Sequence, residues 1–122
     1  MKFEQLEDLR IFRQAEEIAD EIWEEVIKWD YFAKRTVGVQ LVEATDSIGA
    51  NIAEGYGRHH LKDSINFFYF SRGSLEEASF WLRRALKRKL FPESKGQNFI
   101  TKIKNLAPQI NAYIRGKQKY LK

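Results

Sequence analysis

Apolar residues recur every three or four positions in four long segments, and this spacing constrains the fold more than any other feature. A period near 3.6 residues gathers those side chains on one stripe of an α-helix. The spacing predicts helices over residues 8–29, 32–54, 61–90 and 93–117. Only two prolines and seven glycines occur in 122 residues, so few positions interrupt these patterns. The chain is therefore expected to be all-α.

Each predicted helix has one apolar stripe. The first consists of Ile11, Ala15, Ile18, Ile22 and Val26, and the second of Val37, Leu41, Ala44, Ile48 and Ile52. The third contains Leu61, Ile65, Phe68, Leu75, Leu82 and Leu86, and the fourth Phe99, Ile103, Leu106, Ile110 and Tyr113. Proline at 92 should end the third helix, and Pro108 should kink the fourth. Four helices with short links predict an up-down-up-down four-helix bundle, with residues 1–122 forming a single domain.

The composition indicates the cellular compartment in which the protein is expected. The chain has no cysteine, which excludes a disulfide framework and thiolate zinc sites and fits a reducing environment. The first ten residues are charged and lack the apolar region of a secretory signal. No apolar run approaches the ~18 residues of a membrane span. We therefore expect a cytoplasmic protein without a membrane partner.

The stretch SIGANIAEGYGR, residues 47–58, combines small residues with a few polar ones. Ser47, Asn51 and Glu54 are spaced to share one helix face, which predicts a polar seam at a close helix contact. Gly55 suits the left-handed position that closes a helix, and Gly57 adds a second flexible point. A phosphate cradle is disfavoured because such glycines precede a helix and follow a strand. A catalytic Glu54 would lack a partner nucleophile or metal set.

The third predicted helix contains the run INFFYF, whose aromatic side chains point around most of its circumference. These four residues are Phe67, Phe68, Tyr69 and Phe70. A helix that is apolar nearly all round is buried on more than one side, so we expect an oligomer interface here. Trp23 and Trp29 could extend the same surface. The alternative is one unusually aromatic core.

Gly73 lies inside the same helix, where glycine costs about 1 kcal/mol relative to alanine. With Ser74 beside it, it predicts close contact with another helix.

Charge divides the chain into two unequal halves. Residues 1–57 carry 6 Lys/Arg and 13 Asp/Glu, a net charge of −7, whereas residues 58–122 carry 15 and 4, a net charge of +11. The basic half predicts a surface that binds RNA or DNA phosphates, with candidate residues Arg58, His59, His60, Lys62, Arg83, Arg84, Lys87 and Arg88. Cations at a helix C-terminus also favour the helix dipole. A second alternative is a protein-interaction scaffold that binds no nucleic acid, in which the acidic half packs against the basic half of the same or a neighbouring subunit.

No pattern of a catalytic or metal centre occurs. His59 and His60 are adjacent, with Asp63 four residues after His59, but the Glu-x-x-His pairs of bundle di-iron sites are missing. Ser47 and Ser74 lack a histidine base at a recognisable spacing. We therefore expect no cofactor, no metal and no enzymatic activity.

The residues 47–58 resemble the signature SIPANIAEGFGR of the 23S ribosomal RNA intervening-sequence protein family, also called the four helix bundle protein family. Three further pieces agree in order: FEQLEDLRIFRQAEEIADEIW at the start, Gln40-Leu41, and the segment Arg72-Gly73-Ser74-Leu75-Glu76-Glu77. The resemblance covers residues 3–90. Gly49 departs from the signature, which usually has proline there.

Membership would imply a four-helix bundle assembled as a homopentamer, with a poorly defined function. Some members are encoded inside insertions in large-subunit ribosomal RNA genes. A related branch, the accessory variability proteins of diversity-generating retroelements, binds nucleic acid and a reverse transcriptase through a basic surface. The residues here do not assign the chain to that branch.

Overall fold

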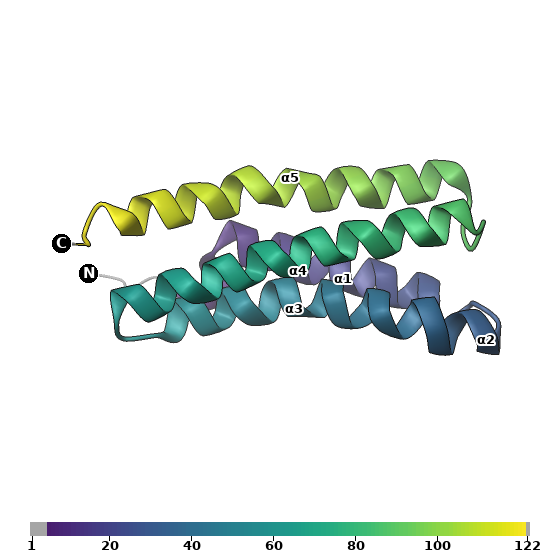
Figure 1. The fold of residues 1–122 in the computed structure, drawn as a ribbon, viewed down its shortest axis with the longest axis horizontal. Coiled ribbons are helices and arrows are strands. Elements are labelled where there is room, and N and C mark those ends of the chain that lie inside the picture. Colours follow the sequence, from purple (N-terminus) through teal and green to yellow (C-terminus); the bar gives the residue numbers. More distant parts are fainter. Residues whose placement is uncertain (1–4, 122) are drawn as a thin grey trace.

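The computed structural model describes residues 5–121, and its architecture is the predicted four-helix bundle (Figure 1). The long helices are α1 (Arg10–Val26), α3 (Val39–Gly57), α4 (Leu61–Lys87) and α5 (Glu93–Gln118). They alternate in direction, so both ends of the described chain lie at the same end of the bundle (Figure 1). Each long helix packs against the next along the chain, and α1 also packs against α5, which leaves α1 and α4 diagonally opposite. No strand occurs in residues 5–121.

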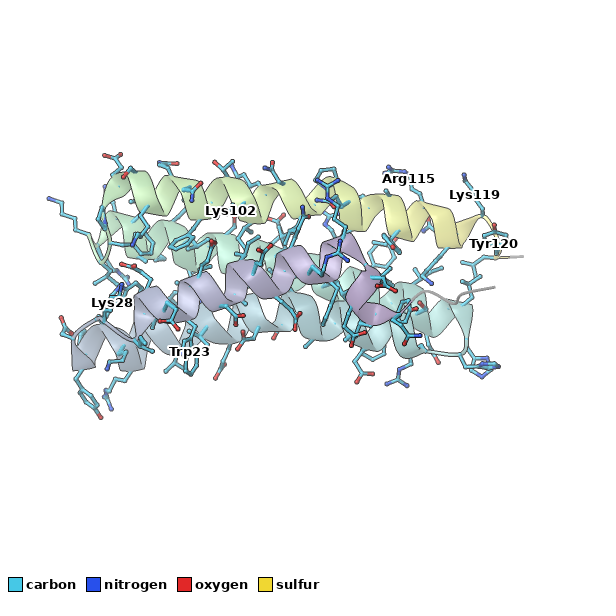
Figure 2. The ribbon with its side chains drawn as sticks, turned by 180° about the vertical axis from the view of Figure 1, so that it is seen from behind. Trp23, Lys28, Lys102, Arg115, Lys119 and Tyr120 are labelled. Carbon is cyan, nitrogen blue, oxygen red and sulfur yellow. The ribbon has the colours of Figure 1, made fainter. Side chains whose placement is uncertain are left out.

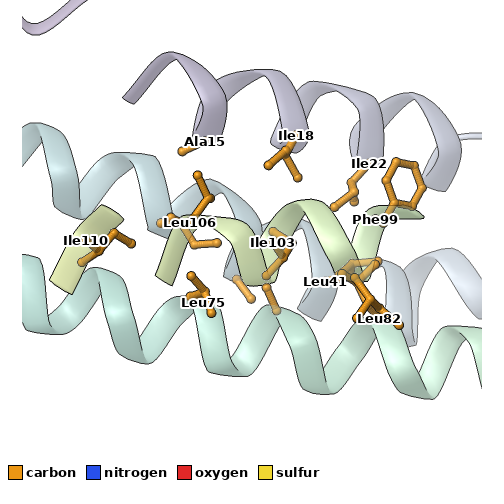
Figure 3. Packing of buried hydrophobic residues seen from close by; sticks show 14 of the residues in the cluster. Ala15, Ile18, Ile22, Leu41, Leu75, Leu82, Phe99, Ile103, Leu106 and Ile110 are labelled. Atoms are coloured by element: carbon orange, nitrogen blue, oxygen red, sulfur yellow. The ribbon is translucent and has the colours of Figure 1, made fainter. Parts of the chain in front are cut away.

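The predicted stripes form the core. Figure 3 shows side chains from all four long helices meeting in one interior, among them Ile22, Leu41, Leu82 and Ile103. Leu41, Leu82 and Ile103 expose none of their surface. Leu61, Leu86 and Tyr113 from the predicted stripes are only half-buried and pack at the core's edge. No helix in the described part of the chain is long and apolar enough to cross a membrane.

The second predicted helix begins with an irregular entry. Asp30 caps α2 (Tyr31–Ala33) by accepting a hydrogen bond from the Ala33 backbone N–H at 2.9 Å. A five-residue π-helix, η2 (Lys34–Gly38), then leads directly into α3. The Thr36 hydroxyl donates to the Phe32 carbonyl oxygen at 2.7 Å inside this wide turn. Such π-helical turns are rare, and they are found more often than chance near functional surfaces.

Gly55 does not cap α3, so that prediction is wrong. The helix continues to Gly57, and no glycine among the described residues has a positive φ. A Cβ at Gly55 would lie 2.8 Å from two ring carbons of Phe68 and 3.1 Å from the Ser64 carbonyl oxygen. Glycine is therefore required because α4 approaches closely, and not because the chain turns.

α4 ends at Lys87, three residues before the predicted end. Lys89 adopts the left-handed conformation with φ 58°. The Leu90 N–H donates to the Ala85 carbonyl and the Lys89 N–H donates to the Leu86 carbonyl, each at 3.0 Å. These two bonds form a Schellman motif, which usually has glycine at the position of Lys89. Pro92 then precedes α5, and α5 runs through Pro108 as one helix.

Candidate nucleic-acid interface

The predicted basic residues do not form one patch, because they lie at opposite ends of α4. Arg58, His59, His60 and Lys62 surround the turn from α3 to α4, whereas Arg83, Arg84, Lys87 and Arg88 lie where α4 meets the turn into α5. A helix of 27 residues is roughly 40 Å long at about 1.5 Å per residue. The two clusters must therefore be judged separately.

The second cluster contributes to a groove of about 1200 Å³ between the end of α4 and the start of α5. We call it the basic groove, defined by its cationic lining residues Arg83, Lys87, Lys89 and Lys104. Apolar side chains including Leu86, Phe91 and Ile100 also line it, and Glu93 is its one acidic lining residue. Arg84 and Arg88 do not line the groove. Lys89 and Lys104 complete the cationic lining, and the left-handed conformation of Lys89 explains how this residue reaches the groove.

The cations of the basic groove are not neutralised by the acidic helix. Within residues 5–121, none of its four Lys and Arg residues forms an ion pair. α1 instead pairs with other lysines of α5: Lys95 contacts Glu25 and Lys102 contacts Glu21, each at 2.8 Å. Packing of the acidic α1 against the basic α5 thus neutralises two lysines, and the basic groove keeps its positive charge.

The α3–α4 end is less basic than its sequence suggests. Arg58 pairs with Glu54 at 3.2 Å, and its guanidinium lies over the Phe67 ring at 4.6 Å from the centroid. Asp63 joins Glu54 in lining the hollow beside the two exposed histidines. His59 and His60 contact each other edge to face at 5.4 Å. In the described part of the chain, no three His, Asp or Glu residues are placed to hold a metal ion.

The polar seam predicted from the signature joins α3 to α4. Asn51 Nδ2 donates to the Ser47 carbonyl oxygen at 2.9 Å and to Ser74 Oγ at 3.4 Å. Glu54 is exposed and lies outside the seam. Sequence reasoning missed two buried serines of α4: Ser71 Oγ donates to the Ile48 carbonyl at 2.9 Å, and Ser64 Oγ to the Gly55 carbonyl at 2.6 Å. Their seven-residue spacing, two helical turns, was the available signal.

The aromatic run of α4 is only partly exposed. Phe68 was predicted at an interface, but it is fully buried and stacks on Tyr113 with ring centroids 5.5 Å apart. Phe67 is half-buried, whereas Tyr69 and Phe70 expose 48% and 56% of their surface. The Tyr69 hydroxyl accepts a hydrogen bond from Gln118 Nε2 at 3.0 Å. The four aromatic residues differ in exposure because successive helix positions are rotated by about 100°, which directs Phe68 into the core.

Within residues 5–121, the expected helix contact at Gly73 is not present. Gly73 is exposed, and no described residue comes within 4 Å of a Cβ placed there. The two tryptophans of the first segment also separate. Trp29 is buried against Phe91, with ring centroids 5.8 Å apart, so it cannot extend an exposed surface. Trp23 is 51% exposed and projects beside α3 (Figure 2), away from the diagonally placed α4.

A second groove, of about 520 Å³, lies between α1 and the π-helical entry to α3. We call it the apolar groove, defined by Trp23, Ile27, Tyr31, Val39 and Val42. Lys34, Arg35 and Glu43 also line it. No single periodic pattern marked this groove, because its defining residues come from α1, α2 and α3 and lie outside the predicted apolar stripes.

Comparisons with known proteins agree on the fold. The profile described as 23S rRNA-intervening sequence protein matches residues 7–112. A crystal structure of a protein with unknown function from the S23 ribosomal protein family of Bacteroides thetaiotaomicron VPI-5482 superposes with a TM-score of 0.77. It is 17% identical, and the match covers 85% of this chain and 97% of that chain. No curated protein sequence matches.

Proposed function

The chain belongs to the 23S rRNA-intervening sequence protein family, as its signature predicted, and from this premise we propose that it binds nucleic acid without catalysing a reaction. The family description names an intervening sequence of 23S rRNA and states no activity. The structural relative is of unknown function as well. The proposal therefore depends on the surface of this chain.

The observation that carries the proposal is the unneutralised basic groove. Four cations line it against one carboxylate, and none of the four forms an ion pair within residues 5–121. Lys and Arg side chains that contact phosphates release condensed counterions, which supplies affinity without reading sequence. Its apolar lining offers no fixed array of donors and acceptors for base edges. We expect recognition by charge and shape.

We further propose that the protein works as a homo-oligomer, and the family resemblance leads us to expect a pentamer. Trp23, Tyr31, Tyr69, Phe70 and Phe80 expose between 48% and 74% of their surface. Large aromatic side chains exposed together favour association. Repeating the basic groove in each copy would raise the avidity for a long nucleic acid.

A salt-titrated binding assay tests the nucleic-acid proposal. Fluorescence anisotropy with an RNA hairpin and a DNA duplex should detect micromolar binding at 50 mM salt. If all four cations contact phosphates, affinity should fall roughly 50- to 150-fold between 50 and 200 mM salt. The variant Arg83→Glu/Lys87→Glu should weaken binding about tenfold or more.

The control is Arg115→Glu/Lys119→Glu, which makes the same change in net charge. Both control residues are exposed at the far end of α5 (Figure 2). Equal losses in the two variants would mean that the groove is not the site. Absence of binding at 50 mM salt would reject the proposal and favour the alternative, a protein-interaction scaffold. The ion pairs of Lys95 with Glu25 and Lys102 with Glu21 support that alternative, since similar pairs could form between copies.

A further inference from the structure

We infer that the chain assembles head to tail, with the exposed face of α4 from one copy seated in the apolar groove of the next. The inference rests on the proposed self-association and names the two surfaces that make the contact. It does not depend on nucleic-acid binding.

The α4 surface is centred on Gly73. Phe70, Gly73, Glu77, Phe80 and Arg84 follow one another at spacings of three and four, so they share one helix face, which we call the aromatic face. Phe70 and Phe80 expose 56% and 51% of their surface. Each is braced by an edge-to-face partner, Phe67 at 5.4 Å and Trp81 at 5.0 Å.

Gly73 has no structural explanation within one copy. It is helical, its φ is not positive, and a Cβ there would meet no atom of the described residues within 4 Å. An exposed helical glycine costs about 1 kcal/mol relative to alanine. The open space between two braced aromatic rings is what a second helix needs in order to approach closely. Gly73 therefore indicates a contact that a single copy cannot make.

The apolar groove offers a complementary surface on a different side of the molecule. Trp23, Ile27, Tyr31 and Val39 expose between 43% and 74% of their surface there. α3 packs against both α1 and α4, so it separates the groove from the aromatic face, and one copy cannot cover its own groove. Two different surfaces that match across copies make a heterologous contact, which repeats from copy to copy.

Charges on the two surfaces favour this pairing and give it a direction. Along the aromatic face, Glu77 precedes Arg84, whose Nε is buried without a hydrogen-bond partner among the described residues. Around the apolar groove, the acidic residue Glu43 lies on α3 and the basic residues Lys34 and Arg35 lie on η2. Placing Glu77 near Lys34 and Arg35 brings Arg84 toward Glu43, with the incoming α4 antiparallel to α1. A parallel α4 would bring like charges together.

Two variants test the inference when they are measured alone and mixed. Trp23→Glu disables the groove and leaves the aromatic face intact, whereas Phe80→Glu does the reverse. Both residues are about half exposed, so each variant should keep its helical circular dichroism spectrum. Sedimentation should show an oligomer for the unchanged chain and a single copy of 14.4 kDa for each variant.

The equimolar mixture decides between contact types. An intact aromatic face on the first variant can bind an intact groove on the second, so the mixture should sediment at twice the single-copy mass and no larger. A mixture that stays monomeric would refute the head-to-tail pairing, and so would variants that keep the oligomer. The control Tyr120→Glu, at a residue 78% exposed outside both surfaces, should assemble normally.

The same variants also distinguish the nucleic-acid-binding proposal from the head-to-tail assembly proposal. Monomeric variants should still bind a short RNA hairpin, because Arg83 and Lys87 are unchanged. Loss of binding by Arg83→Glu/Lys87→Glu with the oligomer intact would support the groove and leave the assembly contact standing. An unchanged chain that sediments as a single copy would refute the head-to-tail inference even if it binds RNA.

Discussion

Gly55→Ala should destabilise the protein although alanine is the better helix former. Gly55 lies inside α3, where alanine alone would contribute about 1 kcal/mol. The added Cβ would lie 2.8 Å from two Phe68 ring carbons and 3.1 Å from the Ser64 carbonyl oxygen. Phe68 is fully buried and stacked on Tyr113, so its ring has little room to move. Overpacking of this kind costs about 1–3 kcal/mol, so after the gain from alanine is subtracted we expect a net loss of up to about 2 kcal/mol.

Gly73→Ala is the matched control, since it makes the same change in an exposed helix position with nothing within 4 Å. It should stabilise a single copy by up to about 1 kcal/mol. In thermal unfolding followed by circular dichroism, Gly55→Ala should lower Tm by up to about 8 °C and Gly73→Ala should raise it by up to about 4 °C. Both are measured at one low protein concentration, because self-association makes Tm concentration-dependent. If Gly55→Ala raises Tm as much as Gly73→Ala does, the close approach of α4 does not explain this glycine.

Three further substitutions test other parts of the structure. Lys89→Gly should stabilise the fold by about 1 kcal/mol in urea unfolding, because Lys89 occupies the left-handed region with φ 58°; an unchanged midpoint would contradict this. Ile103→Ala removes a fully buried side chain and should cost about 2–5 kcal/mol, whereas a loss under 1 kcal/mol would place it outside the core. Burial, followed by repulsion from the nearby Asp20 carboxylate, raises the pKa of Asp46 above 3.8. The folded state therefore binds a proton at Asp46 more tightly than the unfolded chain does, and the protein loses stability as the pH rises and Asp46 ionises. Asp46→Asn should therefore stabilise the protein at pH 7 by less than about 1 kcal/mol, an effect that should vanish below pH 3.8.

The sequence was sufficient to predict the bundle because its core depends on local periodicity. Stripes repeated over about four or more turns leave one side of each helix apolar, and four such sides bury one another. The errors occurred where a distant residue decides the outcome. Gly55 near a helix end has the statistics of a cap, but Phe68 of the next helix makes it a packing residue. Trp29 looked like part of an exposed stripe, but it packs on Phe91, which lies 62 positions later in the chain.

The sequence showed which basic residues the candidate nucleic-acid interface contains, but not where the fold places them. Arg83 and Lys87 were correctly predicted to be neighbours, because residues four positions apart lie on the same face of a helix. The prediction also placed Arg58 in the same basic surface, but the length of α4 separates it from Arg83 and puts it at the other end of the bundle. Lys89 and Lys104 enter the groove only because a left-handed turn folds α5 back along α4. Pro92 marked the end of the helix, but no glycine marked the left-handed position of Lys89.

The two proposed activities use neighbouring faces of one helix and should not compete. Arg83 and Arg84 are consecutive, so about 100° of rotation separates their side chains. Arg83 lines the basic groove beside α5, whereas Arg84 continues the aromatic face that a second copy would cover. Head-to-tail assembly would thus leave the basic groove of every copy open and repeat it at a fixed spacing. A nucleic acid long enough to reach two grooves would gain avidity from assembly, and one that fills a single groove would not.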